Sequence, residues 1–353
     1  MAKRVLVAMS GGVDSAVAAV LLKDQGYDVE GVTLELLPGC PGTSSSAADA
    51  KAVADSIGIP HRVLHYEDSF EQHVVIPFAK SYLRGETPNP CISCNKHIKF
   101  GRLFEEAERD GFDYVATGHY AKVCMDEIGK YHLYQVSHRK DQTYVLYQLG
   151  QAQLKRLLLP VADLSKDQIR EIARANALPV AEKADSQDIC FVPDGSYAPI
   201  VEKFAHSPIG EGDFVNLEGE VLGRHRGSIY YTIGQRKGIG IAYEHPLYVL
   251  DIDAANNRVI LGTNEQLFSS RLVAREMTFL SGEVPGENFT VEAKVRYAAP
   301  AIPAEVRMTS DDQCEVFFQE PIRAITPGQA VVFYQGGEVL GGGVIDHAIR
   351  EEK

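Results

Sequence analysis

A short run of serine, glycine and aspartate residues near the amino terminus could bind a phosphate group. The residues Ser10-Gly11-Gly12-Val13-Asp14-Ser15 follow an apolar run at Arg4–Met9 and precede apolar residues at helical spacing, so they should connect a strand to a helix. The first backbone N–H groups of such a helix converge on one point, where the helix dipole favours an anion. A serine-capped helix start is the simpler explanation, but it does not account for two glycines directly after the strand.

The loop lacks the lysine that kinases and GTPases place among their phosphate ligands, and it does not fit Gly-x-x-x-x-Gly-Lys-Ser/Thr. It resembles instead the Ser-Gly-Gly-x-Asp-Ser loop of the ATP pyrophosphatases. Those enzymes adenylate a carbonyl or carboxyl oxygen with ATP, release pyrophosphate and let a nucleophile displace AMP. The loop alone does not identify the acceptor.

Three of the six cysteines stand in surroundings that suit sulfur chemistry. Cys91 and Cys94 form a Cys-x-x-Cys after Asn89-Pro90, and Cys190 lies far downstream. We expect Cys94 just before a basic helix start, where Lys96 and the positive helix end would stabilise a thiolate. Without a second Cys-x-x-Cys, structural zinc is disfavoured. Two distant cysteines in one cleft would provide a sulfur carrier and a resolving thiol, whereas the alternative is that each is an inert buried side chain.

Alternating strand-like and helix-like stretches up to residue 117 predict a parallel sheet with helices on both faces, and ligands at the carboxyl ends of its strands. Helices are expected at Ala47–Ile57, Phe70–Leu83, Ile98–Asp110 and Leu164–Ala175. After Tyr197 the segments are short and β-rich, Ile229–Ile233 among them, with a break near Ser269–Glu276. We therefore expect an α/β domain at 1–196, a small β-rich domain at 197–272 and a β-barrel at 273–353.

Composition limits the classes of partner. With 35 Lys and Arg against 48 Asp and Glu, the net charge is −13, so nucleic acid would have to meet local basic patches. The sequence contains neither an apolar run of the roughly 20 residues that span a bilayer nor a signal peptide. We expect a cytoplasmic protein without a membrane or DNA partner.

Several motifs occur together in one order. They are Ser10–Ser15, Thr87–Phe100, Ala116–Tyr120, Lys140–Tyr144, Asp185–Phe191, Tyr231–Gly238 and Thr326–Ala330. In this order and spacing the chain resembles the tRNA-specific 2-thiouridylase (MnmA) family from about Arg4 to Ile345. The resemblance implies an adenine nucleotide alpha-hydrolase-like first domain and a C-terminal barrel that contacts tRNA. It also implies ATP-dependent sulfur transfer, through an adenylated intermediate, to carbon 2 of the wobble uridine at position 34.

The resemblance implies roles for individual residues. The ATP-binding positions are Ala8, Met9, Ser10, Gly11, Gly12, Val13, Asp14, Ser15, Leu34 and Gly118. The tRNA-binding positions are Asn89, Pro90, Cys91, His119, Lys140, Asp141, Gln142, Arg296, Tyr297 and Gln329. Cys94 matches the catalytic nucleophile and Cys190 the persulfide carrier, with a transient disulfide between them. ATP with Mg²⁺ and a sulfur donor, either a persulfide carrier protein or sulfide, complete the reaction.

Cys91 departs from the family, many of whose members have aspartate there. Cys91, Cys94 and Cys190 together could hold a [4Fe–4S] cluster with one open iron that binds hydrosulfide. This route and the persulfide route both remain open, as does a Cys91 without a ligand role. Two other functions also remain: another ATP pyrophosphatase with a small-molecule acceptor, which would leave the β-rich domains without a task, and a non-catalytic RNA-binding module.

Overall fold

The computed structural model of the chain describes residues 2–37, 43–137, 140–184, 189–192, 195–205 and 209–350. The first four residues of the Asp185–Phe191 motif lie outside these ranges. Within the described part, none of the helices combines the length and the apolar character needed to cross a membrane.

The N-terminal part is built on a five-stranded parallel sheet in the order β3-β2-β1-β4-β7. Its strands are β1 (Arg4–Ala8), β2 (Asp28–Glu35), β3 (His61–His65), β4 (Tyr114–Ala116) and β7 (Leu157–Leu158). Because all strands are parallel, their carboxyl ends meet at one edge. The phosphate loop, Leu34 and Gly118 all lie at this edge.

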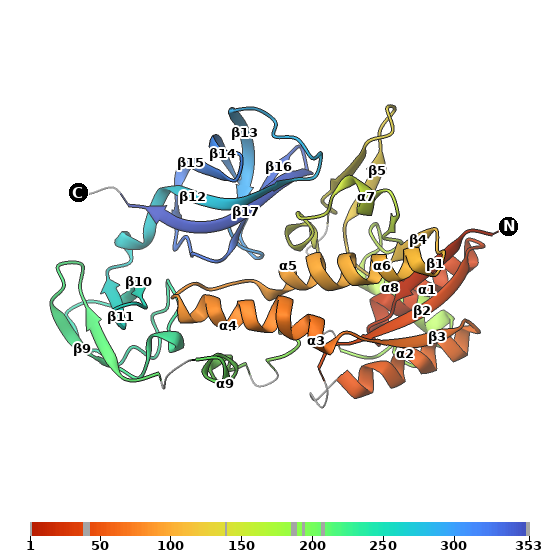
Figure 1. Cartoon of the computed structure of the whole chain (residues 1–353), viewed down its shortest axis with the longest axis horizontal. Coiled ribbons are helices and arrows are strands. Elements are labelled where there is room, and N and C mark those ends of the chain that lie inside the picture. Colours follow the sequence, from red (N-terminus) through yellow and green to blue (C-terminus); the bar gives the residue numbers. More distant parts are fainter. Residues whose placement is uncertain are drawn as a thin grey trace.

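Helices cover both faces of this sheet. On one face α1 (Val13–Asp24), α2 (Thr43–Ile57) and α8 (Lys166–Ala175) pack Val17, Val53 and Ile169 against the strands. The other face is covered by α6 (Leu103–Arg109), whose Leu103 and Phe104 pack against Leu6 and Val32. Figure 1 shows the sheet lying between α2 and α6.

Two long helical rods run from this sheet toward the rest of the molecule (Figure 1). The first consists of α3 (Glu67–Phe70), the π-helical η1 (Glu71–Val75) and α4 (Ile76–Leu83). The second consists of α5 (Pro90–Cys94), the π-helical η2 (Asn95–Arg102) and α6. Both begin earlier than the sequence predicted, and the second begins eight residues before Ile98. The helical residues from Pro90 onward therefore include both cysteines of the Cys-x-x-Cys.

The central part is a small sheet in the order β10-β11-β8-β9. It contains β8 (Gly212–Val215), β9 (Val221–His225), β10 (Tyr248–Asp253) and β11 (Arg258–Gly262), and α9 (Ala198–Lys203) precedes it. The predicted strand at Ile229–Ile233 is wrong. Gly227 has φ +138°, and the following 3-10 turn η4 (Ser228–Tyr230) places Ile229 in the same apolar cluster as Cys94.

The C-terminal part is an antiparallel barrel closed by pairing of its first and last strands, β12 and β17. The barrel strands are β12 (Phe268–Phe279), β13 (Asn288–Lys294), β14 (Ile302–Ser310), β15 (Gln313–Arg323), β16 (Ala330–Gln335) and β17 (Glu338–Ile349). Residues 269–276, where a break was expected, lie inside β12. The predicted fold class, a parallel α/β domain followed by two β-rich domains, is confirmed.

One connection between the parts was not expected from the sequence. The hairpin of β5 (Lys122–Met125) and β6 (Tyr131–Tyr134) leaves the N-terminal part and joins the barrel sheet through β17. Three short helices complete the described elements: η3 (Thr143–Val145), α7 (Gln151–Leu154) and η5 (Glu265–Leu267).

Candidate active site

The phosphate loop is held by its own serines. The Ser15 hydroxyl oxygen accepts a hydrogen bond from the Ser10 backbone N–H at 3.1 Å and donates to the Gly12 carbonyl at 3.1 Å. The Ser10 and Ser15 hydroxyl oxygens are 3.3 Å apart. Gly12 occupies the N-cap of α1 and has no side chain to accept from the first N–H groups of the helix. These groups are thus suited to an anion from outside the chain.

Close packing leaves no room for side chains at two glycines of this site. Gly11 has φ +68°, and a Cβ there would lie 2.4 Å from the Ser46 carbonyl oxygen in the first turn of α2. A Cβ on Gly118 would lie 2.7 Å from the Ser15 backbone nitrogen. The segment after β4 therefore packs directly against the phosphate loop.

A Gly118→Ala substitution is expected to push the first turn of α1 away and weaken ATP binding, with a cost in folding stability of about 1–3 kcal/mol. Calorimetric titration with ATP and a thermal melt would measure both effects. Gly210→Ala is the control, because a Cβ there meets nothing within 4 Å. Unchanged ATP affinity in Gly118→Ala would contradict the placement of Gly118 in the nucleotide site.

Asp14 is tied to Tyr120, the last residue of the Ala116–Tyr120 motif, and to Lys166, which no motif indicated. The Tyr120 hydroxyl donates to an Asp14 carboxylate oxygen at 2.6 Å, and the Lys166 ammonium lies 2.7 and 2.9 Å from its two oxygens. Asp14 therefore ties the loop to α8 and to the segment after β4. No local signal could have revealed Lys166, because it is 152 residues away from Asp14 in the chain.

A second lysine, Lys183, reaches the loop from a turn after α8. Its ammonium donates to the Gly11 carbonyl at 2.9 Å and lies 2.6 Å from an Asp49 carboxylate oxygen in α2. The phosphate loop thus has cations beside it although its own sequence contains no lysine. Lys183 stands two residues before the Asp185–Phe191 motif, the nearest signal in the sequence.

The remaining predicted ATP-binding residues position the loop and its surroundings. Ala8 ends β1, and Met9 and Val13 are buried beside it. The Met9 backbone N–H donates to the Val32 carbonyl at 2.8 Å, which holds the start of the loop against β2. Leu34 packs partly buried against two apolar clusters, one of which contains Cys94 and Phe191. Leu34 therefore joins the cluster around Cys94 to the cluster against which Ala8 packs.

Cys94 does not precede a helix start, and the prediction of a helix-stabilised thiolate is wrong. The helix begins four residues earlier, because the Asn89 side chain caps it by accepting from the Cys91 backbone N–H and Pro90 occupies the first turn. Cys94 lies inside the helix and is only 7 % exposed. Burial raises the pKa of its thiol to about 12, although Lys99 lowers it. At neutral pH Cys94 is therefore a thiol in this structure.

The three cysteines of interest converge. Cys91 and Cys190 are exposed, and both are close enough to Cys94 for their charges to raise its pKa further. Cys94 and Phe191 belong to one buried cluster, against which Ile189 also packs. The structure thus brings Cys190 to the Cys-x-x-Cys from almost 100 residues away. Such a group of thiols could carry sulfur or hold a soft metal.

The raised pKa predicts slow alkylation of Cys94. Because iodoacetamide reacts with the thiolate, Cys91 should be alkylated faster than Cys94 at pH 8, and the rate at Cys94 should still rise about tenfold per pH unit up to pH 10. Tandem mass spectrometry resolves the two, which share one tryptic peptide. A plateau in the Cys94 rate below pH 9 would contradict a pKa near 12.

The segment that leads to the Cys-x-x-Cys is fastened to the barrel. The Thr87 backbone N–H donates to the Pro327 carbonyl at 2.8 Å, and the Gln329 side chain donates to the Thr87 carbonyl at 2.6 Å. Glu86 forms an ion pair with Arg275 of β12 at 3.1 Å. Asn89, Pro90 and Cys91 therefore lie where the N-terminal part meets the barrel.

Most of the other predicted tRNA-binding residues already make contacts within the chain. Arg296 donates to the carbonyls of Arg323 and Ala324. Tyr297 is 41 % exposed and packs edge-on against Tyr144 at 6.1 Å between ring centroids. Partial burial raises the pKa of Tyr297, and the nearby Asp141 and Cys91 raise it further. Of this group, Tyr297 is the aromatic ring best exposed to a base.

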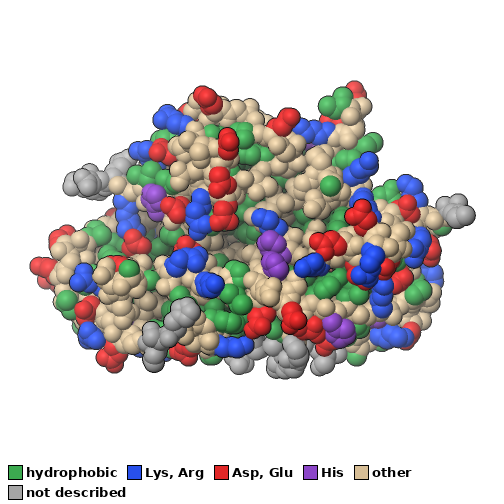
Figure 2. Space-filling view, in the orientation of Figure 1, with side chains coloured by type: hydrophobic (Ala, Val, Ile, Leu, Met, Phe, Trp, Pro, Cys, Tyr) green, Lys and Arg blue, Asp and Glu red, His purple; other side chains and the backbone are tan. Residues whose placement is uncertain are grey.

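Of the four predicted side chains that remain, Asp141, Gln142 and His119 contact other residues of the chain. Asp141 accepts from the Thr143 hydroxyl at 2.7 Å, and Gln142 accepts from the Tyr120 backbone N–H at 2.9 Å. His119 lies 2.8 Å from the Thr117 hydroxyl, and burial lowers its pKa well below the usual value, so that it is neutral near pH 7. Lys140 is exposed. Figure 2 shows basic and acidic side chains interspersed on one face of the molecule.

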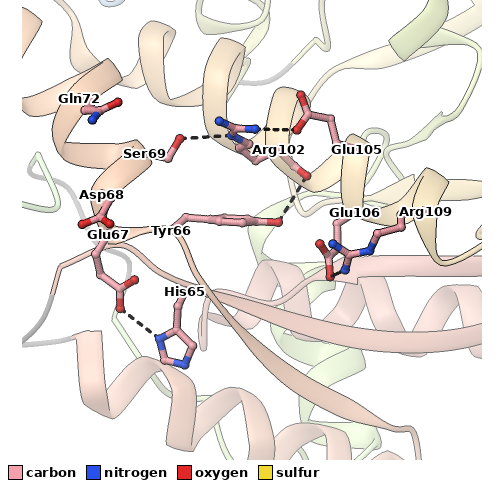
Figure 3. Close-up of a pocket in the computed structure, with 10 residues that line it drawn as sticks. All are labelled: His65, Tyr66, Glu67, Asp68, Ser69, Gln72, Arg102, Glu105, Glu106 and Arg109. Atoms are coloured by element: carbon pink, nitrogen blue, oxygen red, sulfur yellow. Dashed lines mark hydrogen bonds and ion pairs between the residues drawn. The ribbon is translucent and has the colours of Figure 1, made fainter.

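A separate surface pocket of about 790 Å³ opens between the start of the first helical rod and α6 (Figure 3). His65, Glu67, Arg102 and Arg109 line it, and none of the predicted site residues does. Ligand atoms of Glu35, His65 and Glu67 lie within 4.8 Å of one another. Because His65 is 3.1 Å from Glu67 and 3.4 Å from Glu35, ion pairing of a protonated imidazole accounts for this group without a metal.

Known protein families match successive parts of this chain. Three family models match in succession: the tRNA methyl transferase HUP domain at residues 3–194, the tRNA methyl transferase PRC-barrel domain at 201–263 and the aminomethyltransferase beta-barrel domain at 269–345. Among solved structures, a 4-thiouridine synthetase–RNA complex with bound ATP aligns with a TM-score of 0.35 and 18 % identity, over 54 % of this chain and 45 % of that chain.

Full-length relatives are much more similar. The tRNA-specific 2-thiouridylase MnmA of Clostridioides difficile is 48 % identical over 99 % of both chains. The protein of the same name from Carboxydothermus hydrogenoformans is 49 % identical over 98 % of both chains. The predicted resemblance is confirmed, and the chain belongs to the tRNA-specific 2-thiouridylase (MnmA) family.

Proposed function

We propose that this protein is a tRNA sulfurtransferase that uses ATP to convert the wobble uridine of tRNA, at position 34, to 2-thiouridine. One observation carries the proposal: the phosphate loop lies at the carboxyl edge of the parallel sheet, and Leu34 at the same edge packs against the apolar cluster that contains Cys94, which has Cys91 and Cys190 close to it. A loop suited to the phosphates of ATP serves adenylation and has no evident use in the methyl transfer that two of the family-model descriptions name.

The first step activates the base. The uridine 2-oxygen attacks the α-phosphorus of ATP, the bond to the β-phosphate breaks, and pyrophosphate leaves with the electron pair. Ala8–Ser15, Leu34 and Gly118 hold the nucleotide, which we take to bind as its magnesium complex. The N–H groups at the start of α1 neutralise charge that moves onto the departing phosphates.

The second step delivers sulfur. On the persulfide route, a donor places a sulfane sulfur on Cys190, and the terminal sulfur attacks carbon 2 while AMP leaves. The Cys94 thiolate then attacks the Cys190 sulfur, which releases 2-thiouridine and forms a Cys94–Cys190 disulfide for an external dithiol to reduce. Cys94 must lose its proton first, and Lys99 is the cation that favours this loss.

The cluster route uses the same residues differently. Cys91, Cys94 and Cys190 would hold a [4Fe–4S] cluster, and their mutual repulsion as thiolates is consistent with a cation bound between them. The cluster would supply an open iron for hydrosulfide.

The measurement that separates the routes is iron and sulfide content together with the absorption spectrum of anaerobically reconstituted protein. If Cys91→Ser lost the cluster spectrum, that would support a ligand role for Cys91. If wild type showed no cluster spectrum, the persulfide route would be left.

The tRNA contacts remain a prediction. We propose that the anticodon enters at the junction of Asn89, Pro90 and Cys91 with Tyr297, and that His119, Lys140–Gln142, Arg296 and Gln329 shape the surface around it. Arg296 and Gln329 would have to exchange their present partners for RNA or act by holding the junction closed. We also propose that the domain boundaries lie at residues 196 and 272 and that the protein is cytoplasmic.

The acceptor can be tested by asking whether pyrophosphate release needs tRNA. We expect ATP cleavage to AMP and pyrophosphate only with a tRNA that has uridine at position 34, and none with the same transcript bearing cytidine there. Pyrophosphate release with a small metabolite and no tRNA would favour the alternative ATP pyrophosphatase. RNA binding without any ATP cleavage would favour the non-catalytic module.

A further inference from the structure

Lys183 has no assigned role in the family resemblance, yet its ammonium lies directly on the phosphate loop. It contacts the Gly11 carbonyl at 2.9 Å and the Asp49 carboxylate at 2.6 Å. Its backbone is firmly placed, because the Lys183 N–H donates to the Val180 carbonyl and Val180 packs in the core beside α1. The side chain is 37 % exposed, so a ligand bound at the loop can reach it.

The two lysines at the loop differ in how strongly they are held. Lys166 contacts both oxygens of Asp14 and is 19 % exposed. Lys183 contacts a single oxygen of Asp49, which is itself 39 % exposed. An exposed ion pair is worth about 1 kcal/mol or less, whereas an ammonium gains more from phosphate oxygens in a partly enclosed site. Lys183 is therefore the lysine that can move onto a ligand.

We propose that Lys183 binds the β- and γ-phosphates of ATP and stabilises the pyrophosphate that leaves during adenylation. The inference depends on the adenylation step of the proposed function. When ATP binds, the ammonium exchanges the Gly11 carbonyl or Asp49 for phosphate oxygens. It keeps its three protons throughout, so it acts by charge alone while the bond between the α-phosphorus and the bridging oxygen breaks. In the nucleotide-free protein, Asp49 holds the side chain over the loop.

This role explains why the loop needs no lysine of its own to contact the β- and γ-phosphates. In a Gly-x-x-x-x-Gly-Lys-Ser/Thr loop, the lysine belongs to the loop and reaches the β- and γ-phosphates. Here a residue 172 positions away supplies the same charge at the carbonyl of Gly11. The start of α1 supplies the N–H groups, and Lys183 supplies the full positive charge.

The test compares ligands that have and lack the outer phosphates. Wild type, Lys183→Gln and Lys183→Arg are titrated calorimetrically, without tRNA and with Mg²⁺, using a non-hydrolysable ATP analogue, AMP and pyrophosphate. In Lys183→Gln, the ATP analogue and pyrophosphate should bind about 10- to 100-fold more weakly, because one charge-assisted contact is lost, while AMP affinity stays within twofold. Lys183→Arg should recover most of the difference.

A purely structural Lys183 would give a different pattern. If the residue only held Gly11 in place, Lys183→Gln would lose as much affinity for AMP as for the ATP analogue, and that result would overturn the proposal. An unchanged affinity for the ATP analogue would also overturn it. Lys51→Gln is the matched control, because Lys51 lies on the same helix as Asp49 in an exposed pair with Asp55. Should wild type make 2-thiouridine while Lys183→Gln binds the ATP analogue normally, the inference fails and the proposed function stands.

Discussion

A Cys94→Ala variant is expected to make no measurable 2-thiouridine while still binding tRNA and ATP. Cys94 is buried beside Cys91 and Cys190, so it is the one thiol of the three that is shielded from solvent. The persulfide route loses the nucleophile that releases sulfur, and the cluster route loses a ligand. Either way we expect at least a 1,000-fold fall in product, as is usual when a nucleophile is removed. Mass spectrometry of digested tRNA measures it.

Cys314→Ala is the matched control for this variant. Cys314 is also fully buried, and burial raises its pKa to about 12 as well, but it lies in the barrel beside Met277. The Cys314→Ala variant should retain normal activity with a small loss of stability. If Cys94→Ala kept more than a tenth of wild-type product, Cys94 would be an inert core residue like Cys314.

An Asp14→Ala variant is expected to lose AMP formation by about 100-fold or more. Asp14 is the acceptor for Tyr120 and a partner of Lys166, so its removal takes away the side chain that ties the first turn of α1 to α8 and to the segment after β4. A displacement of about 1 Å at reacting groups costs roughly 100-fold in rate. AMP released per tRNA is the measurement.

The control for Asp14 lies on the same helix. Asp24 is exposed at the far end of α1, and Asp24→Ala should form AMP at the wild-type rate. Normal AMP formation in a folded Asp14→Ala protein would contradict the assignment of Ser10–Ser15 as the nucleotide loop. Far-ultraviolet circular dichroism and thermal melting establish that each variant is folded.

Local signals predicted most of the N-terminal fold. The strand, loop and helix from Arg4 to Asp24 follow from an apolar run, a glycine pair and a helical repeat, all of which act within a few residues. The helix start before Cys94 was missed although its signals were present. Asn89 is a favoured cap and Pro90 a favoured first residue, but both were assigned only to tRNA contact.

The residues that complete the site could not be derived from local pattern. Lys166 and Lys183 reach the loop only because α8 and the turn after it pack against α1. The approach of Cys190 to Cys94 likewise depends on packing of Phe191 against Phe70 and Phe78. Ile229 was misassigned because its β-branched neighbours favour a strand locally, whereas its burial beside the cysteine cluster requires a tight turn.

The most direct test of the central claim is quantification of 2-thiouridine at position 34 of an unmodified tRNA transcript, incubated anaerobically with the protein, ATP and a sulfur source. Iron-free protein with a persulfide donor and cluster-reconstituted protein with sulfide are assayed side by side. We expect 2-thiouridine at that position in at least one preparation, dependent on ATP and absent with Cys94→Ala. No 2-thiouridine in either preparation, from protein that binds both ATP and tRNA, would contradict it.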